Sequence, residues 1–195
     1  SSEVLTYASE YNNEQQIGNE IESGKAVYGA LQQNDYDEVA KQYLMLVAKK
    51  AEDGDFKEAM QQAKRFLDIL VCDEHLYGAI EDVPESLHRS SHWGPKFIAA
   101  LLSLYAQKYE DALALIGEVL EGHQCAEALY IKSRALAKLE RYTEADETNS
   151  QLANVFEMAT PDAKVLFMIA MLNELHIGDP GLDLMRKLVE ARPKY

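Results

Sequence analysis

Four residues between Cys72 and Trp93 have the chemistry and the spacing of a zinc site. They follow the pattern C-x2-H-x12-H-x3-H and are Cys72, His75, His88 and His92. Thiolate and imidazole are the ligands that zinc prefers. A zinc finger of this spacing also needs a small apolar core, but Ala79 and Glu85 stand where an aromatic residue and a leucine are needed. We therefore expect no metal here, and a zinc-containing module organised by the four residues is an alternative hypothesis.

Catalytic patterns are scarce in the rest of the chain. Cys125 follows His123 by two positions, which suggests a thiol–imidazole pair, but both stand at a junction before a helical stretch. The sequence has no G-x-S-x-G elbow, no glycine-rich phosphate loop and no H-E-x-x-H motif. We therefore predict a protein that is not an enzyme and that uses no cofactor.

The charge of the chain argues against two classes of partner. Acidic residues number 33 and basic residues 19, which gives a formal net charge of −14. Such a surface repels phosphate backbones and anionic lipid, so we expect neither nucleic acid nor a membrane surface as a partner.

Nothing in the sequence predicts membrane insertion or export. The longest nearly unbroken apolar run, Phe97 to Ala106, is shorter than the ~20 residues of a membrane span. The N-terminal stretch lacks the basic start and apolar core of a signal peptide. Because the chain has only two cysteines, far apart in the sequence, the simplest expectation is a cytoplasmic protein.

A turn signature recurs along the chain. It consists of an aromatic residue, a variable residue, an acid and then alanine, and it begins at Phe56, Tyr109 and Tyr142, with a weaker copy at Tyr36. Tyr109 and Tyr142 are 33 residues apart. Each copy sits between two stretches with helical apolar spacing, which predicts a tight helix-to-helix turn. A period of this length predicts stacked helical hairpins.

The stretch from Ala126 to Glu157 resembles a tetratricopeptide repeat over its full length, with helices expected at 126–139 and 143–157. Four residues match the motif, namely Leu129, Leu136, Tyr142 and Ala145, and three depart from it, namely Lys132, Ser133 and Asn149. Stretches beginning at Tyr43 and Pro95 resemble the same repeat, and a degenerate copy begins at Thr160. The resemblance implies an all-α fold, a right-handed α-α superhelix built as a solenoid of antiparallel helical hairpins.

The repeat pattern also predicts the domain organisation. We expect residues 1–35 to form a partly polar helical extension and residues 36–195 to form the repeat domain. Phe56 and Tyr109 are 53 residues apart in place of 33, so about 20 extra residues fall between them. We interpret residues 71–93 as an enlarged connection, with a short helix around Glu74 to Ile80 and a turn at 82–86.

The resemblance implies a binding surface as well. In this family the first helix of each hairpin lines a concave groove, and the positions that face it carry over to Phe97, Leu101, Leu104, Tyr130, Arg134, Met168 and Leu172. The helix around Phe97 is apolar on all sides, so full burial is an open alternative. Repeats that grip the acidic C-termini of heat-shock chaperones carry Lys and Asn where this chain has Tyr130 and Ile131, so we do not expect that role.

These observations favour a protein–protein adaptor or scaffold, a subunit of a larger multiprotein assembly. A rigid curved surface of this kind accepts a helix or an extended peptide from a protein partner. The alternatives are a secretion-type chaperone that shields a partner's apolar segment and the zinc-containing module described above.

Overall fold

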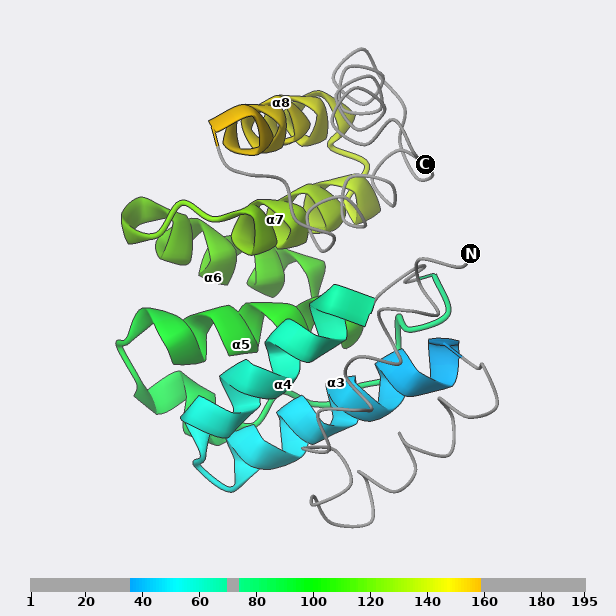
Figure 1. Cartoon of the computed structure of the whole chain (residues 1–195), viewed down its shortest axis with the longest axis vertical. Coiled ribbons are helices and arrows are strands. Elements are labelled where there is room, and N and C mark those ends of the chain that lie inside the picture. The colour runs from blue at the N-terminus through cyan, green and yellow to red at the C-terminus, as the bar shows by residue number, and fades with distance from the viewer. Residues whose placement is uncertain (1–35, 70–73, 159–195) are drawn as a thin grey trace.

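The computed structural model describes residues 36–69 and 74–158, and every regular element within them is a helix. Six are α-helices: α3 (Tyr36–Glu52), α4 (Phe56–Ile69), α5 (Trp93–Tyr105), α6 (Tyr109–Gly122), α7 (Ala126–Lys138) and α8 (Tyr142–Met158). A 3₁₀-helix, η1, spans Glu85–Arg89. The helices follow one another along the long axis, with α3 and α4 at one end and α8 at the other (Figure 1). The prediction of an all-α protein is confirmed for these residues, and the right-handed superhelix stays a prediction.

Three of the turns between helices share one backbone geometry. The residue two positions before the aromatic has a positive φ, namely 79° at Gly54, 61° at Gln107 and 60° at Glu140. The next N–H donates to the carbonyl five positions back, from Asp55 to Lys50, from Lys108 to Ser103 and from Arg141 to Leu136, at 2.8 to 2.9 Å. This is the Schellman arrangement, which ends a helix and redirects the chain within a few residues. The recurring turn in the sequence is therefore one repeated local structure.

The residues of the turn signature take the same places in each hairpin. The aromatic residue begins the second helix, at Phe56 in α4, Tyr109 in α6 and Tyr142 in α8. The alanine three positions later, at Ala59, Ala112 and Ala145, is at most 1% exposed. A small side chain at that position lets the two helices of a hairpin approach closely.

Helix α5 forms the centre of the described structure. Its residues from Phe97 to Tyr105 are all buried, and it packs against α3, α4, α6, α7 and η1. A helix that is apolar on all sides needs neighbours on all sides, because any open face would expose apolar surface to water. The alternative of full burial is the one that the structure shows for this helix.

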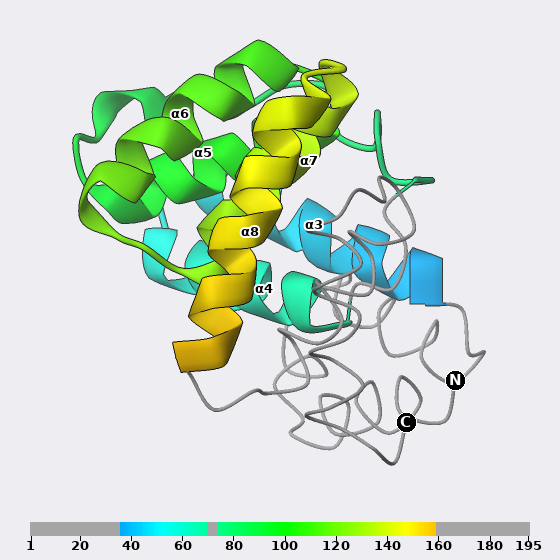
Figure 2. The ribbon, with the colours of Figure 1, turned by 90° about the horizontal axis from the view of Figure 1, so that it is seen from above.

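The packing between successive hairpins is uneven. Helix α6 packs along both α5 and α7, and α7 packs along α8, which covers it in the view of Figure 2, whereas α4 meets α5 only over a short stretch. The chain between residues 74 and 92 contributes Leu76, Ile80 and Leu87 to the core, and η1 contacts both α3 and α5. The extra residues of the enlarged connection therefore replace part of a direct contact between two hairpins.

The local structure of the connection differs from the expectation in two ways. Residues 74–78 form turns and not the expected short helix, because Gly78 adopts a φ of 92° that ends regular helical geometry. Helical structure appears instead at Glu85–Arg89, after Pro84, where a simple turn was expected. Proline before the first turn suits a helix start, since its missing N–H has no partner to lose.

Other expectations fall partly or wholly outside the described residues. The expected helices at 126–139 and 143–157 are present as α7 and α8, with ends that differ by at most one residue. The extension 1–35 and the degenerate repeat from Thr160 onwards lie outside the described residues. None of the helices within 36–69 and 74–158 is long and apolar enough to span a membrane.

Candidate partner-binding site

The structure buries the side chains that the sequence places on an open groove. Phe97, Leu101, Leu104, Tyr130 and Arg134 are at most 4% exposed. A partner therefore reaches little of these side chains in this conformation, although Phe97 also borders a hollow. The remaining two groove residues, Met168 and Leu172, lie outside the described residues.

The enlarged connection places an aromatic side chain against three helices. The ring centroid of Tyr77 lies 5.2 Å from that of Tyr105 in α5 and 6.1 Å from that of Tyr109, the first residue of α6. Two cations of α7 lie over the same ring, Arg134 Cζ at 5.7 Å and Lys138 Nζ at 4.0 Å from its centroid. Cations are attracted to the negative face of an aromatic ring. Tyr77 is thus held by α5, α6 and α7 together.

Polar contacts fasten the same segment, residues 74–82, which we name the strap. The backbone N–H of Gly78 donates to the carbonyl of Tyr105 at 2.7 Å. The carboxylate of Glu74 accepts a hydrogen bond from the ammonium of Lys138 at 3.2 Å. The strap therefore combines main-chain, aromatic and ionic contacts with the helices that follow it in the chain.

The shape of the strap depends on a glycine. Gly78 has a φ of 92°, a conformation that glycine adopts without steric cost. A Cβ at Gly78 would lie 3.7 Å from the side chain of Gln107, which is ordinary contact, so the backbone angle is the constraint at this position. At the end of the strap, the carboxylate of Asp82 lies 3.8 Å from the ammonium of Lys108.

An apolar hollow lies between α4 on one side and α5 with the start of α7 on the other. We name it the Trp93 hollow; its volume is about 160 Å³, and it is lined by Met60, Lys64, Leu67, Trp93, Phe97, Cys125 and Glu127. Helix α4 supplies one wall, and α5 with the start of α7 supplies the other. Met60, Trp93 and Cys125 are half-buried and Lys64 is exposed, so the hollow opens to solvent.

The indole of Trp93 is fixed by its neighbours. Its centroid lies 4.3 Å from the ring of His123, and the two planes are inclined by 32°. The ring centroid of the preceding residue, His92, lies 6.4 Å from that of Trp93. His92 also caps α5, because its Nδ1 accepts a hydrogen bond from the N–H of Gly94 at 3.5 Å. A large aromatic side chain held in this way forms a preorganised wall for an apolar group.

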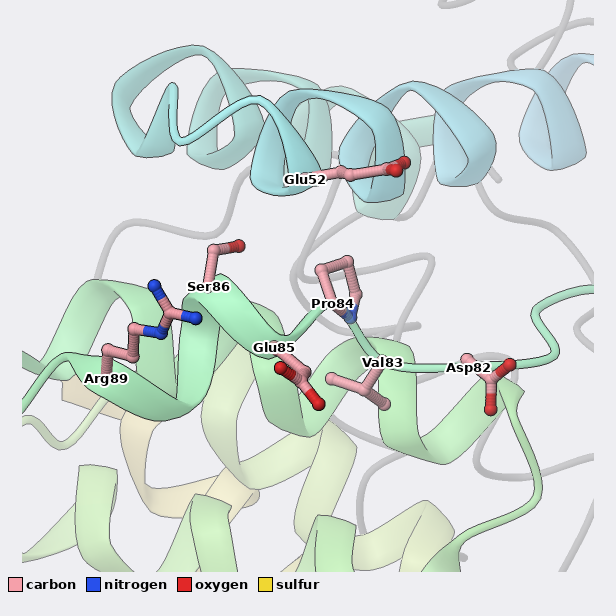
Figure 3. A pocket seen from close by; sticks show the side chains of 7 residues that line it. All are labelled: Glu52, Asp82, Val83, Pro84, Glu85, Ser86 and Arg89. Atoms are coloured by element: carbon pink, nitrogen blue, oxygen red, sulfur yellow. The ribbon is translucent and has the colours of Figure 1, made fainter.

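A second, more polar hollow lies between the end of α3 and the chain that follows the strap (Figure 3). Its volume is about 530 Å³, and its lining residues are Glu52, Asp82, Val83, Pro84, Glu85, Ser86 and Arg89. The hydroxyl of Ser86 donates to the carbonyl of Ala51 at 2.5 Å, which joins this segment to α3. Of its carboxylates, Glu52 comes from α3, and Asp82 and Glu85 come from the facing segment.

A third hollow of about 330 Å³ brings together Ser103, His88 and Asp111, with Val83, Lys108, Ala114 and Leu115. The residue types suggest nucleophilic catalysis, which requires a hydrogen bond from the nucleophile to the base. Among these described side chains no such bond joins serine, histidine and aspartate. The arrangement therefore gives no support to a catalytic triad.

The zinc hypothesis concerns the same region. Cys72 lies outside the described residues, and His75, His88 and His92 are exposed. Within the part of the chain that the structure describes, no group of three or more His, Cys, Asp or Glu side chains is arranged to hold a metal ion. The three histidines therefore do not form a binding cluster by themselves.

Comparison with known proteins adds no relative. No protein-family model, no curated protein and no solved structure matches the chain at a significant level. The assignment of the candidate site therefore depends only on the residues of this chain and their geometry.

Motif reasoning missed both the strap and the Trp93 hollow. The signal that was available is the break in the period, since 53 residues separate Phe56 and Tyr109. Extra residues at that point must pack somewhere, and the aromatic residues among them, Tyr77 and Trp93, are the ones with the most surface to bury.

Proposed function

We propose that the protein is a non-enzymatic adaptor, a tetratricopeptide-like stack that acts as a cytoplasmic subunit of a protein assembly. The observation that carries this proposal is the Trp93 hollow, an apolar recess at the meeting point of α4, α5 and α7. The recurrent turn geometry and the 33-residue period support the repeat architecture. Of the buried groove residues, only Phe97, which borders the hollow, is a direct contact in this proposal.

The size of the hollow fits a single side chain of a partner. Its volume of about 160 Å³ is close to the ~150 Å³ of an apolar cavity that accepts a benzene molecule. Methionine, cysteine and aromatic walls adapt to different apolar shapes. A partner thus inserts one large apolar residue, such as Leu, Met or Phe, as a binding hot spot.

The net charge of the chain indicates the charge of the partner segment that binds at the hollow. With a net charge of −14, the protein attracts a basic segment and repels an acidic one over long range. Lys64 and Glu127, one on each wall, give the hollow a polar rim of both signs. The occupant is thus a basic amphipathic segment of another protein, anchored by one apolar side chain.

The test is a pair of substitutions read out on captured partners. Met60→Glu places a carboxylate in the hollow at a half-buried position, and Met45→Glu makes the same change at an exposed position of α3. Proteins that bind the wild type and the Met45→Glu control should be lost with Met60→Glu. Calorimetry on a purified partner should then show about 30-fold weaker binding, which is the usual scale of a hot spot. Equal binding to all three proteins would overturn the proposal.

Salt dependence separates the adaptor from a chaperone that shields apolar segments. Binding of a basic segment should weaken as ionic strength rises, because screening removes the long-range attraction. Binding of a purely apolar segment should not weaken with salt. A salt-independent partner would therefore favour the chaperone hypothesis over the adaptor.

A further inference from the structure

Three hollows lie around the junction between the α3–α4 hairpin and the helices that follow. The largest joins the end of α3 to residues 82–89, the second lies between that segment and α5–α6, and the Trp93 hollow separates α4 from α5 and α7. Helices α3 and α4 each meet α5 only over a short stretch, whereas α6 packs along both α5 and α7. This junction is therefore the place where the described helices are held together least by direct packing.

The strap crosses this junction. It follows α4 after only four residues, and its Tyr77 and Gly78 are fastened to α5, α6 and α7. Its Glu74 is joined to Lys138 at the end of α7. The segment that leaves one wall of the Trp93 hollow is thus anchored on the helices that carry the opposite wall.

We propose that the strap positions α4 and so keeps the Trp93 hollow in its binding shape, with Tyr77 as the positioning residue. Met60, Lys64 and Leu67 move with α4, whereas Trp93, Phe97, Cys125 and Glu127 stay with α5 and α7. Helix α4 meets α5 only over a short stretch, so the anchored strap adds a restraint on the distance between these two walls to the one that α3 supplies through its contacts with α5 and η1. This inference rests on the proposed function for what the hollow binds, and it adds how the shape of that site is maintained.

The contacts of Tyr77 determine how much binding in the hollow weakens when its ring is removed. Its ring takes part in two aromatic contacts and lies beneath two cations, and all four disappear when the ring is removed. Loss of several such contacts shifts a two-state equilibrium by about tenfold or more. When only a fraction of molecules has the competent shape, the apparent affinity falls by that fraction. Release of Tyr77 therefore weakens binding in the hollow without any contact between Tyr77 and the partner.

The experiment uses the full chain without a partner. Trp93 is the only tryptophan, so tryptophan fluorescence reports on this one wall of the hollow, and acrylamide is the probe of its accessibility. Tyr77→Ala should raise the acrylamide quenching constant about twofold and speed amide exchange in α4 relative to α8. Tyr77→Phe keeps the ring and should restore the wild-type values. Tyr142→Ala removes a tyrosine that is 45% exposed in another hairpin and is the control.

A second variant covers the case in which Tyr77→Ala does not fold. Glu74 is exposed, and Glu74→Lys replaces its attraction to Lys138 with repulsion while leaving the buried strap residues unchanged. It should change Trp93 quenching and α4 exchange in the same direction by a smaller factor. Unchanged quenching in both folded variants, or exchange that rises equally in α4 and α8, would overturn the positioning role.

The outcomes for the two proposals are distinguishable. Quenching and exchange are measured without partner, so they judge the strap alone, whereas Met60→Glu judges the hollow as a binding site. A Tyr77→Ala protein with a loosened α4 and undiminished partner affinity would refute a role of the strap in maintaining the shape of that site. About tenfold weaker binding by Tyr77→Ala, restored by Tyr77→Phe, would support it.

Discussion

The ammonium of Lys138 lies 4.0 Å from the centre of the Tyr77 ring. The same ammonium lies 3.2 Å from the carboxylate of Glu74, so one side chain at the end of α7 holds two residues of the strap. Lys138 and Glu74 are 64 positions apart in the sequence, so their ion pair joins distant parts of the chain. The end of α7 thus connects the last described hairpin to the chain that leaves the first one.

Replacing Lys138 with methionine should lower the free energy of unfolding by about 1 kcal/mol. The methionine keeps an apolar stem over Tyr77 but removes both the cation–π contact and the ion pair with the half-exposed Glu74. Lys49→Met is the matched control, because Lys49 and Asp53 are half-exposed and 4.0 Å apart. Urea unfolding of both variants measures the difference. An equal and negligible change in both would contradict a stabilising role for Lys138.

The positive φ angles of the turns predict opposite effects of two substitutions. Glu140→Gly should raise the free energy of unfolding by about 0.5 to 1 kcal/mol, because a residue with a Cβ at a φ of 60° is strained. Gly54→Ala should lower it by about 1 kcal/mol for the same reason. The effect of Gly54→Ala should come from the backbone angle alone, because Gly54 is exposed and nothing lies within 4 Å of a Cβ at this position.

Gly117 provides the control for these turns. It lies within α6, a Cβ there also meets nothing within 4 Å, and Gly117→Ala should stabilise the protein by about 0.5 to 1 kcal/mol. Thermal and urea unfolding of the three variants test the set. If Gly54→Ala stabilised the protein as Gly117→Ala does, the account from positive φ would be wrong.

The helices were predictable because their signals are local. The aromatic-x-acid-Ala signature lies at the start of α4, α6 and α8, and the expected start of the last of these, residue 143, is one residue late, since turn geometry depends on a few adjacent residues. The φ of Gln107 and Glu140 was not predictable, because the usual sign of a left-handed residue is glycine or asparagine. At these two turns the backbone hydrogen bonds of Lys108 and Arg141 accompany the positive φ without a glycine.

The candidate site was much less predictable, because it depends on contacts between distant residues. The groove positions carried over from the repeat family are mostly interior in this structure, and the hollow forms where that pattern is interrupted. The position of Tyr77 against α5 and α7 depends on how an irregular segment folds back, and periodicity contains no information about this. Trp93 begins α5, and its role as a wall of the hollow depends on α4 and Cys125 as well.

The carboxyl of Glu144 should titrate below the ordinary range of a glutamate. Arg141 Nε and Nη2 donate to its two oxygens at 2.8 and 2.7 Å, and these hydrogen bonds, with the charge of Arg141, lower the pKa of Glu144 against a smaller opposing effect of desolvation. A lowered pKa in the folded state means that this contribution to stability is complete above the pKa of an unfolded glutamate and is lost as the pH falls through the folded value. Titration by NMR should show the pKa of Glu144 return upward in Arg141→Gln. An unchanged titration curve would show that the pair does not persist in solution.

The last prediction concerns two residues that depart from the repeat pattern and that the structure places in contact. The hydroxyl of Ser133 in α7 donates to Oδ1 of Asn149 in α8 at 2.6 Å, and both side chains are buried. Because an unmade hydrogen bond inside a protein leaves a desolvated polar group, Ser133→Ala or Asn149→Leu alone should cost about 1 to 3 kcal/mol of unfolding free energy. The two changes together remove donor and acceptor at once, so the double variant should recover most of that loss.

Ser150→Ala, at an exposed position of α8, is the control and should change little. A double-mutant cycle by urea unfolding measures the coupling, which we expect to be at least about 1 kcal/mol. Losses that simply add would mean that the two departures are independent, and that the hydrogen bond between α7 and α8 does not stabilise this hairpin.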